Sequence, residues 1–329
     1  MGIQIVTGRK FLGGFIGGSE DVITWMEEKV RGWVSSVYKL AKVAKSQPQA
    51  AFVAFTKSLQ AEWAYFQLVM ENSSTFFYPL KAAIVENFLP DLFGSCITET
   101  ESKLFCRPSR HVGIGILDPV KTAQSQFFKS KEATAHLIYA ITNCSPLDLQ
   151  KHEHAVRNAV KRKEDEEQMD RDESIELINT FPAKTQRCIM RKLDFKCSGW
   201  VSIIPTLENH FDMKPDEFRD SLALRNGQTP CKMPSLCDGD GEIFDVDHAL
   251  NCAKGGLVYA RHNELRDLNC SLLELARLKQ ILSEPIVKDD GEELLRADWA
   301  ARGFWESQKQ ALFDGCVVNA DSPSYRIHR

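Results

Sequence analysis

The sequence predicts an α+β protein, with an N-terminal α-helical bundle followed by a small α/β domain. Three observations support this prediction. Apolar residues recur at helical spacing over residues 19–88, with charged residues opposite them. A densely charged segment, 151–176, follows and is typical of a solvated helix or linker. Beyond it come a turn rich in cysteine and short segments of strand-like composition. We therefore expect three parts: 1–142, 143–175 and 176–329.

Composition sets the broad class of protein. A chain of 329 residues is long enough for two domains with separate cores. With 43% hydrophobic and 26% charged residues, it resembles an ordinary soluble globular protein and not a disordered one. The formal net charge of −4 neither favours nor excludes nucleic-acid binding, because local clustering of charge defines a binding face. No segment approaches the ~20 apolar residues that a membrane span requires, so no membrane association is expected.

The cysteines and the first residues of the chain indicate in which cellular compartment the protein is expected. The chain has ten cysteines, and its first ten residues lack the long apolar core of a signal peptide. We therefore expect an intracellular protein, in the nucleus or cytoplasm, whose thiols stay reduced. Metal binding is then a better interpretation of the cysteines than disulfides.

The N-terminal third of the chain predicts two short strands and then helices. The glycine-rich segment Phe11–Gly18 lacks the spacing of a nucleotide-binding loop, so a tight turn between two strands is the better interpretation. A strand is also expected at Ile3–Val6. The expected helices begin at Ser19, at Pro48 and at Pro79, the last running to about Phe88 and ended by Pro90.

The segment after the charged region predicts a strand and a helix. Val201–Pro205 reads as a short buried strand, and Asp216–Arg225 as an amphipathic helix ended by Asn226–Gly227. Arg219 and Arg225 are candidates for phosphate contact, with packing or surface roles as the alternative.

A cluster of metal-binding residue types follows. Cys231, Cys237, His248 and Cys252 lie close together in a run of Gly, Asp and Pro, and this set suits tetrahedral zinc. The alternative is that the cysteines are small buried hydrophobes. Asp238–Gly241 cannot build an ordinary core and needs something to hold it, which favours structural Zn²⁺.

Three acidic residues near the C-terminus form a second candidate site. Apolar residues at helical spacing predict a helix that opens at Arg261 and carries Glu264 in its first turn. Asp298 is expected near the end of one short strand, and Asp314 within the next. Carboxylates so placed could hold Mg²⁺, which would polarise a phosphodiester and activate water. The alternative is that these residues are simply solvated strand ends.

The run CDGDG…FDVDHALNCAKGGLV…RHNELRD, which begins at Cys237, resembles reverse transcriptase proteins of non-LTR retrotransposons that carry a restriction-like endonuclease. The family pattern at the junction of its zinc knuckle and endonuclease is C-D-G-C-G, then H-A-L-x-C-x-K-G-G, then R-H-N-E. Asp240 stands where the family has its second cysteine. The resemblance implies zinc ligands at Cys237, His248 and Cys252, with Cys231, Asp240 or water as the fourth. Cys231 is favoured because thiolates bind zinc tightly.

The resemblance extends to the N-terminal part, from about residue 8 to about residue 139. GRKFLGGFIGG resembles the last palm hairpin of the reverse transcriptase, and WVSSVYKLAKVAKSQPQAAFVAFTKSLQAEW resembles its helical thumb. Nucleotidyl transfer needs carboxylates that hold two Mg²⁺ ions. Before residue 140 the only aspartates are Asp21, Asp91 and Asp118, and none is adjacent to another. Reverse transcriptase activity is therefore not expected.

The C-terminal resemblance concerns the endonuclease, whose pattern is R-H-N-E, an aspartate, G-F/V-W and F-D-V-R-V. It implies that Glu264 orients the site and that Asp298 and Asp314 bind Mg²⁺. The family's basic residue, two positions after the second aspartate, is replaced by Cys316. Losing such a cation costs on the order of a hundredfold or more in rate.

Together these features lead to the hypothesis of a retrotransposon-derived, nucleic-acid-binding protein with a Mg²⁺-dependent restriction-like DNA endonuclease domain. Its expected partners are DNA or RNA, and no small-molecule cofactor is expected. Two substitutions, Asp240 and Cys316, leave alternatives open: a non-catalytic, zinc-stabilised nucleic-acid-binding module, or a decayed element.

Overall fold

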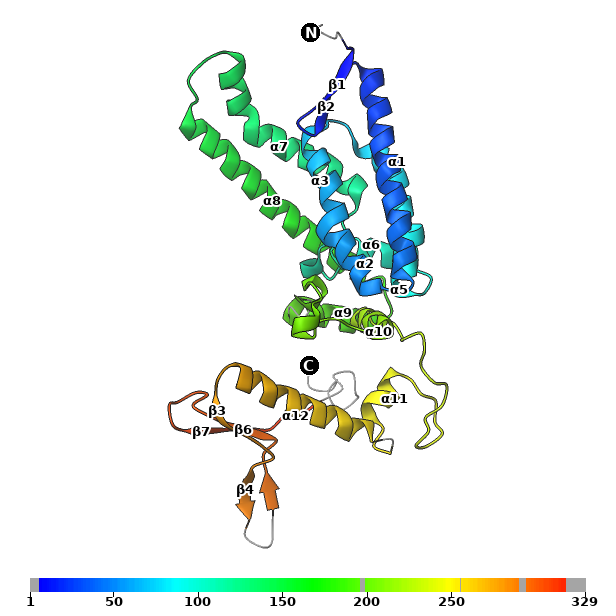
Figure 1. The fold of residues 1–329 in the computed structure, drawn as a ribbon, viewed down its shortest axis with the longest axis vertical. Coiled ribbons are helices and arrows are strands. Elements are labelled where there is room, and N and C mark those ends of the chain that lie inside the picture. The colour runs from blue at the N-terminus through cyan, green and yellow to red at the C-terminus, as the bar shows by residue number, and fades with distance from the viewer. Residues whose placement is uncertain (1–5, 196–198, 255, 290–293, 318–329) are drawn as a thin grey trace. The chain divides into compact units, whose positions relative to one another are not determined.

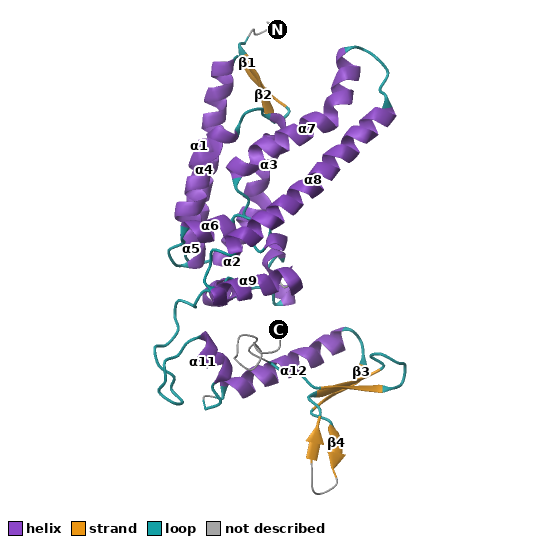
Figure 2. Ribbon diagram, turned by 180° about the vertical axis from the view of Figure 1, so that it is seen from behind, coloured by secondary structure: helices purple, strands orange, loops and turns teal. Residues whose placement is uncertain are grey.

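The computed structural model describes residues 6–195, 199–254, 256–289 and 294–317. The chain divides into two compact units, Met1–Cys231 and Lys232–Arg329. The first unit is mainly helical, and the second combines helices with small antiparallel sheets (Figures 1 and 2). The fold is thus α+β, as the sequence predicts. The division falls after residue 231 and not around residues 143–175, because the helices that follow the charged segment pack into the first core.

The first unit contains one β-hairpin and a series of α-helices joined by short turns. Its strands and α-helices are β1 (Gly8–Phe11), β2 (Gly14–Gly17), α1 (Ser19–Ala44), α2 (Pro48–Ala54), α3 (Gln60–Val69), α4 (Tyr78–Ala83), α5 (Leu89–Phe93), α6 (Glu99–Phe105), α7 (Pro119–Thr142), α8 (Leu149–Ile178), α9 (Ala183–Phe195) and α10 (Pro215–Arg225). Its π-helical and 3₁₀ turns are η1 (Phe55–Leu59), η2 (Ser74–Phe77), η3 (Ile84–Phe88), η4 (Ser109–His111), η5 (Gly199–Ser202) and η6 (Leu207–Asn209).

The glycine-rich segment forms the predicted turn. β1 and β2 pair antiparallel, with Gly8 opposite Gly17 and Phe11 opposite Gly14. The two residues between the strands, Leu12 and Gly13, have φ angles of 45° and 84°, the left-handed conformation that a tight hairpin turn requires. The predicted strand Ile3–Val6 lies almost entirely outside the described residues.

Helix α1 carries the stripe that organises the first core. Its buried residues follow one another at three- or four-residue spacing and are Met26, Val30, Trp33, Val37, Ala41 and Ala44. Trp33 makes ring contacts with Trp63, Phe66 and Phe77. Such buried aromatic contacts contribute beyond area burial, by roughly 0.5–1.5 kcal/mol each. The helices predicted to start at Ser19 and Pro48 are confirmed.

The prediction that Pro90 ends a helix is wrong. Residues 78–93 continue through α4, the π-helical turn η3 and α5, and the helical run ends at Gly94, which has a φ of 72°. In η3 the N–H of Leu89 already bonds to the carbonyl of Ile84, five residues back. Just before Pro90, the backbone hydrogen bonds thus reach back five residues instead of four. Pro90, which has no N–H to donate, is tolerated at this irregular point of the helix.

The charged segment is a regular helix, α8, that lies beside α7 in both views (Figures 1 and 2). Ion pairs join the two helices: Lys121 contacts Asp170 at 2.6 Å and Glu173 at 2.7 Å, and Arg162 contacts Glu132 at 2.7 Å. Charges that suggest a solvated linker along the sequence are thus matched by opposite charges on a neighbouring helix.

The segment before the unit boundary differs from prediction in one place. Val201 is buried, at 4% exposure, but it lies in the 3₁₀ turn η5 and not in a strand. A short apolar run cannot by itself distinguish a strand from another buried segment. The predicted helix at Asp216–Arg225 is confirmed as α10, and Gly227, with a φ of 68°, follows its end.

In its described residues, the second unit has two α-helices and five short strands. They are α11 (Val246–Asn251), α12 (Leu257–Leu275), β3 (Lys279–Ser283), β4 (Ile286–Asp289), β5 (Leu294–Arg296), β6 (Trp299–Arg302) and β7 (Gln310–Phe313). One antiparallel sheet has the order β3-β6-β7, and β4 and β5 form a separate hairpin. Helix α12 begins four residues before the predicted start at Arg261. Within the described residues, no helix has the length and apolarity that a membrane span requires.

Candidate metal centre

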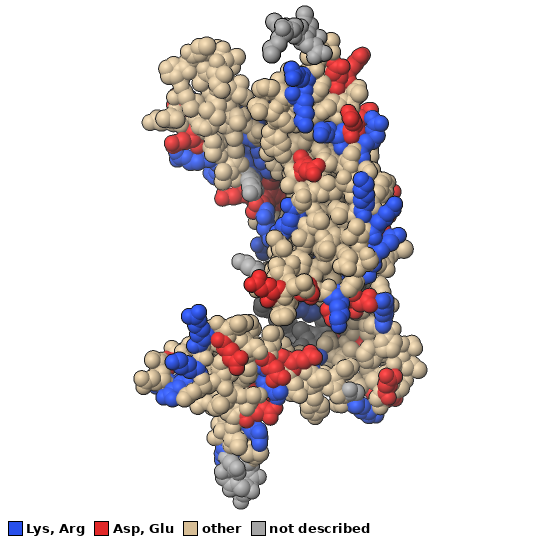
Figure 3. All heavy atoms as spheres, in the orientation of Figure 1, with Lys and Arg blue, Asp and Glu red and all other residues tan. Residues whose placement is uncertain are grey.

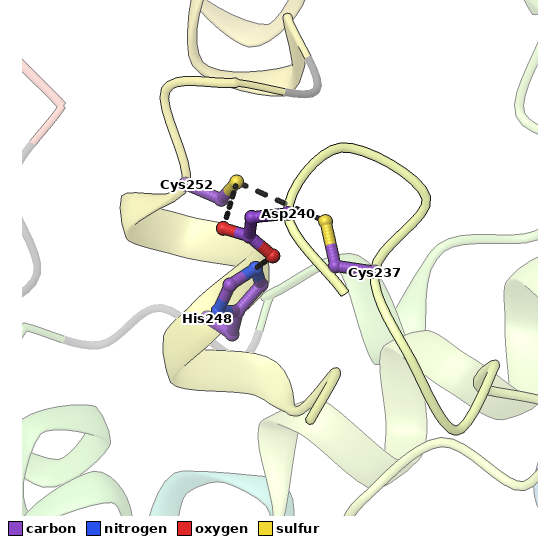
Figure 4. Close-up of side chains that lie close together, drawn as sticks. All are labelled: Cys237, Asp240, His248 and Cys252. Atoms are coloured by element: carbon purple, nitrogen blue, oxygen red, sulfur yellow. Dashed lines mark hydrogen bonds and ion pairs between the residues drawn. The ribbon is translucent and has the colours of Figure 1, made fainter. Parts of the chain in front are cut away.

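Four side chains of metal-binding type converge in the second unit. They are Cys237, Asp240, His248 and Cys252, and one ligand atom from each lies within 4.8 Å of the others. Figure 4 shows the four side chains pointing toward one another. Cys237 and Asp240 come from a loop, His248 from the short helix that follows, and Cys252 from the residue just after that helix. It is the one such group of three or more residues within the described part of the chain.

The loop that carries the first two ligands is a small hairpin. Leu236 and Ile243 form an isolated antiparallel bridge. Between them, the N–H of Gly241 bonds to the carbonyl of Cys237 at 2.9 Å, and Gly241 has a φ of 73°. A side chain is strained at such a φ, so glycine suits this position. The tight turn brings Cys237 and Asp240 to the same place.

Helix α11 positions the other two ligands. Asp245 caps this helix by accepting the backbone N–H of His248 at 2.7 Å. Cys252 follows His248 by four residues, and its N–H bonds to the His248 carbonyl at 2.8 Å. Residues four apart lie on the same face of a helix. The His-x3-Cys spacing therefore directs both side chains toward the loop.

The distances between ligand atoms approach those of a tetrahedral metal site. The two sulfur atoms, Cys237 Sγ and Cys252 Sγ, lie 3.9 Å apart. Cys252 Sγ lies 3.5 Å from Asp240 Oδ2, and His248 Nε2 lies 3.4 Å from Asp240 Oδ1. A tetrahedral ion with zinc-like bond lengths separates two sulfurs by about 3.8 Å, a sulfur and an oxygen by about 3.5 Å, and a nitrogen and an oxygen by about 3.3 Å. Binding requires movement of about 1 Å at the widest separation.

Burial and protonation are consistent with a metal site. Cys237 and Cys252 are 8% and 7% exposed. His248 Nε2 is buried and has no hydrogen-bond partner within the described residues, an arrangement that metal coordination would satisfy. The backbone N–H of Glu242 holds the pKa of the Asp240 carboxyl below its usual range, and hydrogen bonds from the two thiols lower it further. Asp240 is thus a carboxylate, the form that binds metal.

The neighbours of Cys237 shift the pKa of its thiol in opposite directions. The N–H of Gly239 lowers its pKa, but burial and the neighbouring Cys252 and Asp240 act in the other direction, and the net shift of the pKa is upward. A cation held between these groups would reverse the shift by favouring the thiolate.

The fourth position of the group is taken by Asp240 and not by Cys231. Cys231 is exposed, belongs to the first unit and lines a surface pocket there beside Phe93 and Arg219. The softness of a thiolate favours Cys231 from the sequence alone, and this prediction is wrong. The C-D-G-C-G pattern is the better guide to the fourth ligand, because Asp240 occupies the place of its second cysteine.

Asp298 and Asp314 lie opposite each other at one end of the sheet. Strands β6 and β7 pair with Trp299 opposite Phe313, so the preceding Asp298 faces the following Asp314. The Asp298 N–H donates to the Phe313 carbonyl at 3.0 Å, and Asp298 Oδ2 accepts the Gly315 N–H at 2.5 Å. Asp314 directly follows β7 and is exposed; the sequence had placed it within the strand.

The third predicted carboxylate does not join this pair. His262 Nε2 lies 3.0 Å from Asp298 Oδ1. Glu264 comes two residues later on α12, about 200° around the helix axis, and therefore points to another side. Among the described residues, no group of three possible metal ligands contains Asp298. Sequence reasoning missed His262, although it lies in the R-H-N-E run.

Comparisons of the chain with protein-family models, with curated proteins and with solved structures found no match.

Proposed function

We propose that the chain is a retrotransposon-derived nucleic-acid-binding protein whose second unit is stabilised by a zinc ion. The observation that carries the proposal is the convergence of four ligand atoms within 4.8 Å. Two thiolates, one imidazole and one carboxylate at tetrahedral spacing suit Zn²⁺, whereas Mg²⁺ and Ca²⁺ prefer six or more oxygen ligands. With four protein ligands the site is closed, which is typical of a structural zinc site and not of a catalytic one.

The ion would fix a segment that has little core of its own. In the loop, Leu236 is 55% exposed and Ile243 is 75% exposed, so apolar burial contributes little to holding it. Arg261 on α12 donates to the Leu250 carbonyl of α11 at 3.2 Å. Zinc bound between the loop and α11 would thus also stabilise the start of α12.

Phosphate contact is assigned to one end of the three-stranded sheet. The metal loop is acidic, since it carries Asp238 and Glu242, and repels a phosphate backbone. At the sheet, Lys279 lies opposite Arg302 in register. Figure 3 shows Lys and Arg side chains gathered where Figure 1 draws β3 and β7. The exposed cations of this end are Arg277, Lys279, Arg302 and Lys309. Such a cluster supplies the sequence-independent part of nucleic-acid affinity.

The first test is the metal content of the purified full chain. We expect about one zinc per chain. Cys252→Ser and Asp240→Ala should lose most of it, because three remaining ligands bind zinc far less tightly. Cys231→Ser is the matched control and should retain the metal. Zinc loss from Cys231→Ser with retention in Asp240→Ala would refute the assigned ligand set.

The second test is binding of single- and double-stranded DNA and of RNA, followed by fluorescence anisotropy at several salt concentrations. The double substitution Lys279→Ala/Arg302→Ala should weaken binding at least tenfold and reduce the salt slope by one to two charges, as expected for lost phosphate contacts. Arg31→Ala/Lys57→Ala, at two exposed positions of the first unit, is the charge-matched control. Equal affinity in all three proteins would remove the sheet end from the interface.

A second candidate function is Mg²⁺-dependent endonuclease activity, and the facing pair Asp298 and Asp314 favours it. Two carboxylates on adjacent strands can hold Mg²⁺, and His262 beside Asp298 could orient that carboxylate. Supercoiled plasmid incubated with the protein and Mg²⁺ tests this candidate. Nicking that Asp298→Asn abolishes would support the enzyme, and Cys316→Arg should raise the rate by about a hundredfold by restoring a cation. DNA binding without nicking would leave the non-catalytic module.

A further inference from the structure

The first unit contains a cationic pocket that neither proposed function uses. It has a volume of about 460 Å³, within the range of small-ligand sites. Its walls come from η4, α8, α9 and η5. The lining residues are Ser109, Arg110, His111, Arg171, Lys192, Leu193 and Gly199. Every titratable side chain in this lining is basic.

Two nitrogen atoms of the pocket residues lack partners. Lys192 Nζ and His111 Nδ1 are both buried and have no hydrogen-bond partner within the described residues. The ammonium nitrogen of Lys192 is buried, whereas the residue as a whole is half-buried. Burying an ammonium without a counter-charge is costly, and proteins rarely retain such a group without a use for it.

The side chains that the structure describes around Lys192 do not supply that counter-charge. Burial, and then the nearby Arg225 guanidinium, lowers the pKa of Lys192 to about 7. Two acidic residues of α8 lie near the pocket. Glu167 pairs with Arg110 of the lining at 2.8 Å, and Asp170 pairs with Lys121, outside the lining, at 2.6 Å. Among the described residues, neither acidic group pairs with the Lys192 ammonium.

We propose that this pocket binds a phosphate group, with Lys192 and His111 as inner donors and Arg171 at the exposed rim. A phosphate offers several oxygens and one to two negative charges, which matches an ammonium, an imidazole and a guanidinium from three elements. The Ser109 hydroxyl adds a neutral donor. On the face of the first unit drawn in Figure 3, Lys and Arg side chains are interspersed with Asp and Glu.

The phosphate could belong to a nucleic-acid backbone or to a small phosphate ester, and the same protein can distinguish these sources. Inorganic phosphate, adenosine monophosphate and a single-stranded oligothymidylate without a terminal phosphate serve as probes. Calorimetric titration of the full chain at constant ionic strength measures each affinity. Displacement of the oligonucleotide by inorganic phosphate would assign the pocket to a strand. Binding of the first two probes alone would assign it to a small ester.

Substitutions test the assigned donors. Lys192→Met, which replaces the buried ammonium with an apolar chain of similar length, should lower phosphate affinity at least tenfold. Arg171→Ala, at an exposed position, should lower it several-fold without affecting the fold. Lys184→Met is the matched control, because it lies on the same helix outside the pocket lining, and it should bind as the wild type does. Circular dichroism and thermal unfolding verify that each variant is folded.

Two outcomes would overturn the inference: no phosphate binding by the wild type, or equal affinity in the wild type and in both pocket variants. Cys252→Ser, which removes a proposed zinc ligand in the other unit, should leave phosphate binding unchanged. A failure of the zinc proposal is thereby distinguishable from a failure of this one.

Discussion

The guanidinium group of Arg219 is held by backbone carbonyls in the first unit. It donates to the carbonyls of Ala44 and Lys45 at the end of α1, at 2.8 and 2.9 Å, and to that of Leu92 in α5 at 3.3 Å. Carbonyls at helix ends have no partner within the helix, so this side chain caps two helices at once. Arg225 likewise donates to two loop carbonyls. Of the roles that the sequence left open for these arginines, the structure favours packing.

Arg219→Met should therefore destabilise the first unit. We expect a loss of about 1.5–3 kcal/mol in the free energy of unfolding, because hydrogen bonds from a charged donor disappear and partly buried carbonyls are left unpaired. Urea unfolding followed by tryptophan fluorescence measures the change. Lys214→Met, at an exposed position just before α10, is the control and should change little. Similar stability in both variants would show that the cap contributes nothing.

The lowered pKa of Lys192 should also make the free energy of unfolding depend on pH. Its pKa is about 7 in the folded chain and about 10.5 when unfolded, so between these values the unfolded chain binds more protons. Stability should then rise with pH from about 7 toward 10.5, by on the order of 4 kcal/mol for this group.

A second buried group acts with the opposite sign above pH 9. Burial raises the pKa of the Cys106 thiol to about 12, so the unfolded chain releases that proton first and stability falls as pH rises. The informative quantity is therefore the difference between the wild type and Lys192→Met, measured in phosphate-free buffer between pH 7 and 9. A difference that does not vary with pH would contradict an enclosed ammonium.

Among the elements, helices α7 and α8 are capped in the same way, but only the cap of α7 also makes an ion pair with another helix. Each helix begins at an aspartate that caps it: Asp118 accepts the N–H of Val120 at 2.9 Å, and Asp148 accepts that of Lys151 at 3.1 Å. Asp118 is also partly buried and lies 2.6 Å from Lys81 of α4. The two caps thus share local chemistry but differ in their surroundings.

Replacing each of the two capping aspartates with alanine should lower the stability of the protein by different amounts. Asp118→Ala should cost about 2 kcal/mol, because it removes a cap and leaves Lys81 without its partner. Asp148→Ala, at an exposed cap, should cost at most about 1 kcal/mol. Thermal and chemical unfolding of the two variants compares them directly. Equal costs would mean that the contact between α4 and α7 adds no stability.

At the level of the whole molecule, the division into two units predicts separate responses to metal removal. All four metal-centre residues lie in the second unit, whereas the aromatic core lies in the first. Chelation should therefore increase proteolytic cleavage between residues 232 and 256 and leave the main unfolding transition unchanged. Limited proteolysis with mass spectrometry, with and without a chelator, measures this. Loss of the main transition on chelation would contradict independent cores.

The sequence was most informative where local spacing decides the structure. The apolar stripe from Val22 to Val37 predicts α1, and the short spacing of Cys237, His248 and Cys252 predicts that they share a metal site. The sequence was not informative where a contact between residues far apart in the chain decides the structure. The spacing of Pro90 gave no sign of the π-helical turn before it, and the charges of α8 gave no sign of their partners on α7.

The sequence by itself determined the α+β class, the aromatic helical core and three of the four residues at the metal centre, because periodicity and ligand spacing are local properties of the chain. Only the tertiary structure selected Asp240 over Cys231, set His262 beside Asp298 and enclosed Lys192 in a basic pocket. Each of these depends on the distance between residues that lie apart in the chain, and the folding of the intervening backbone fixes that distance.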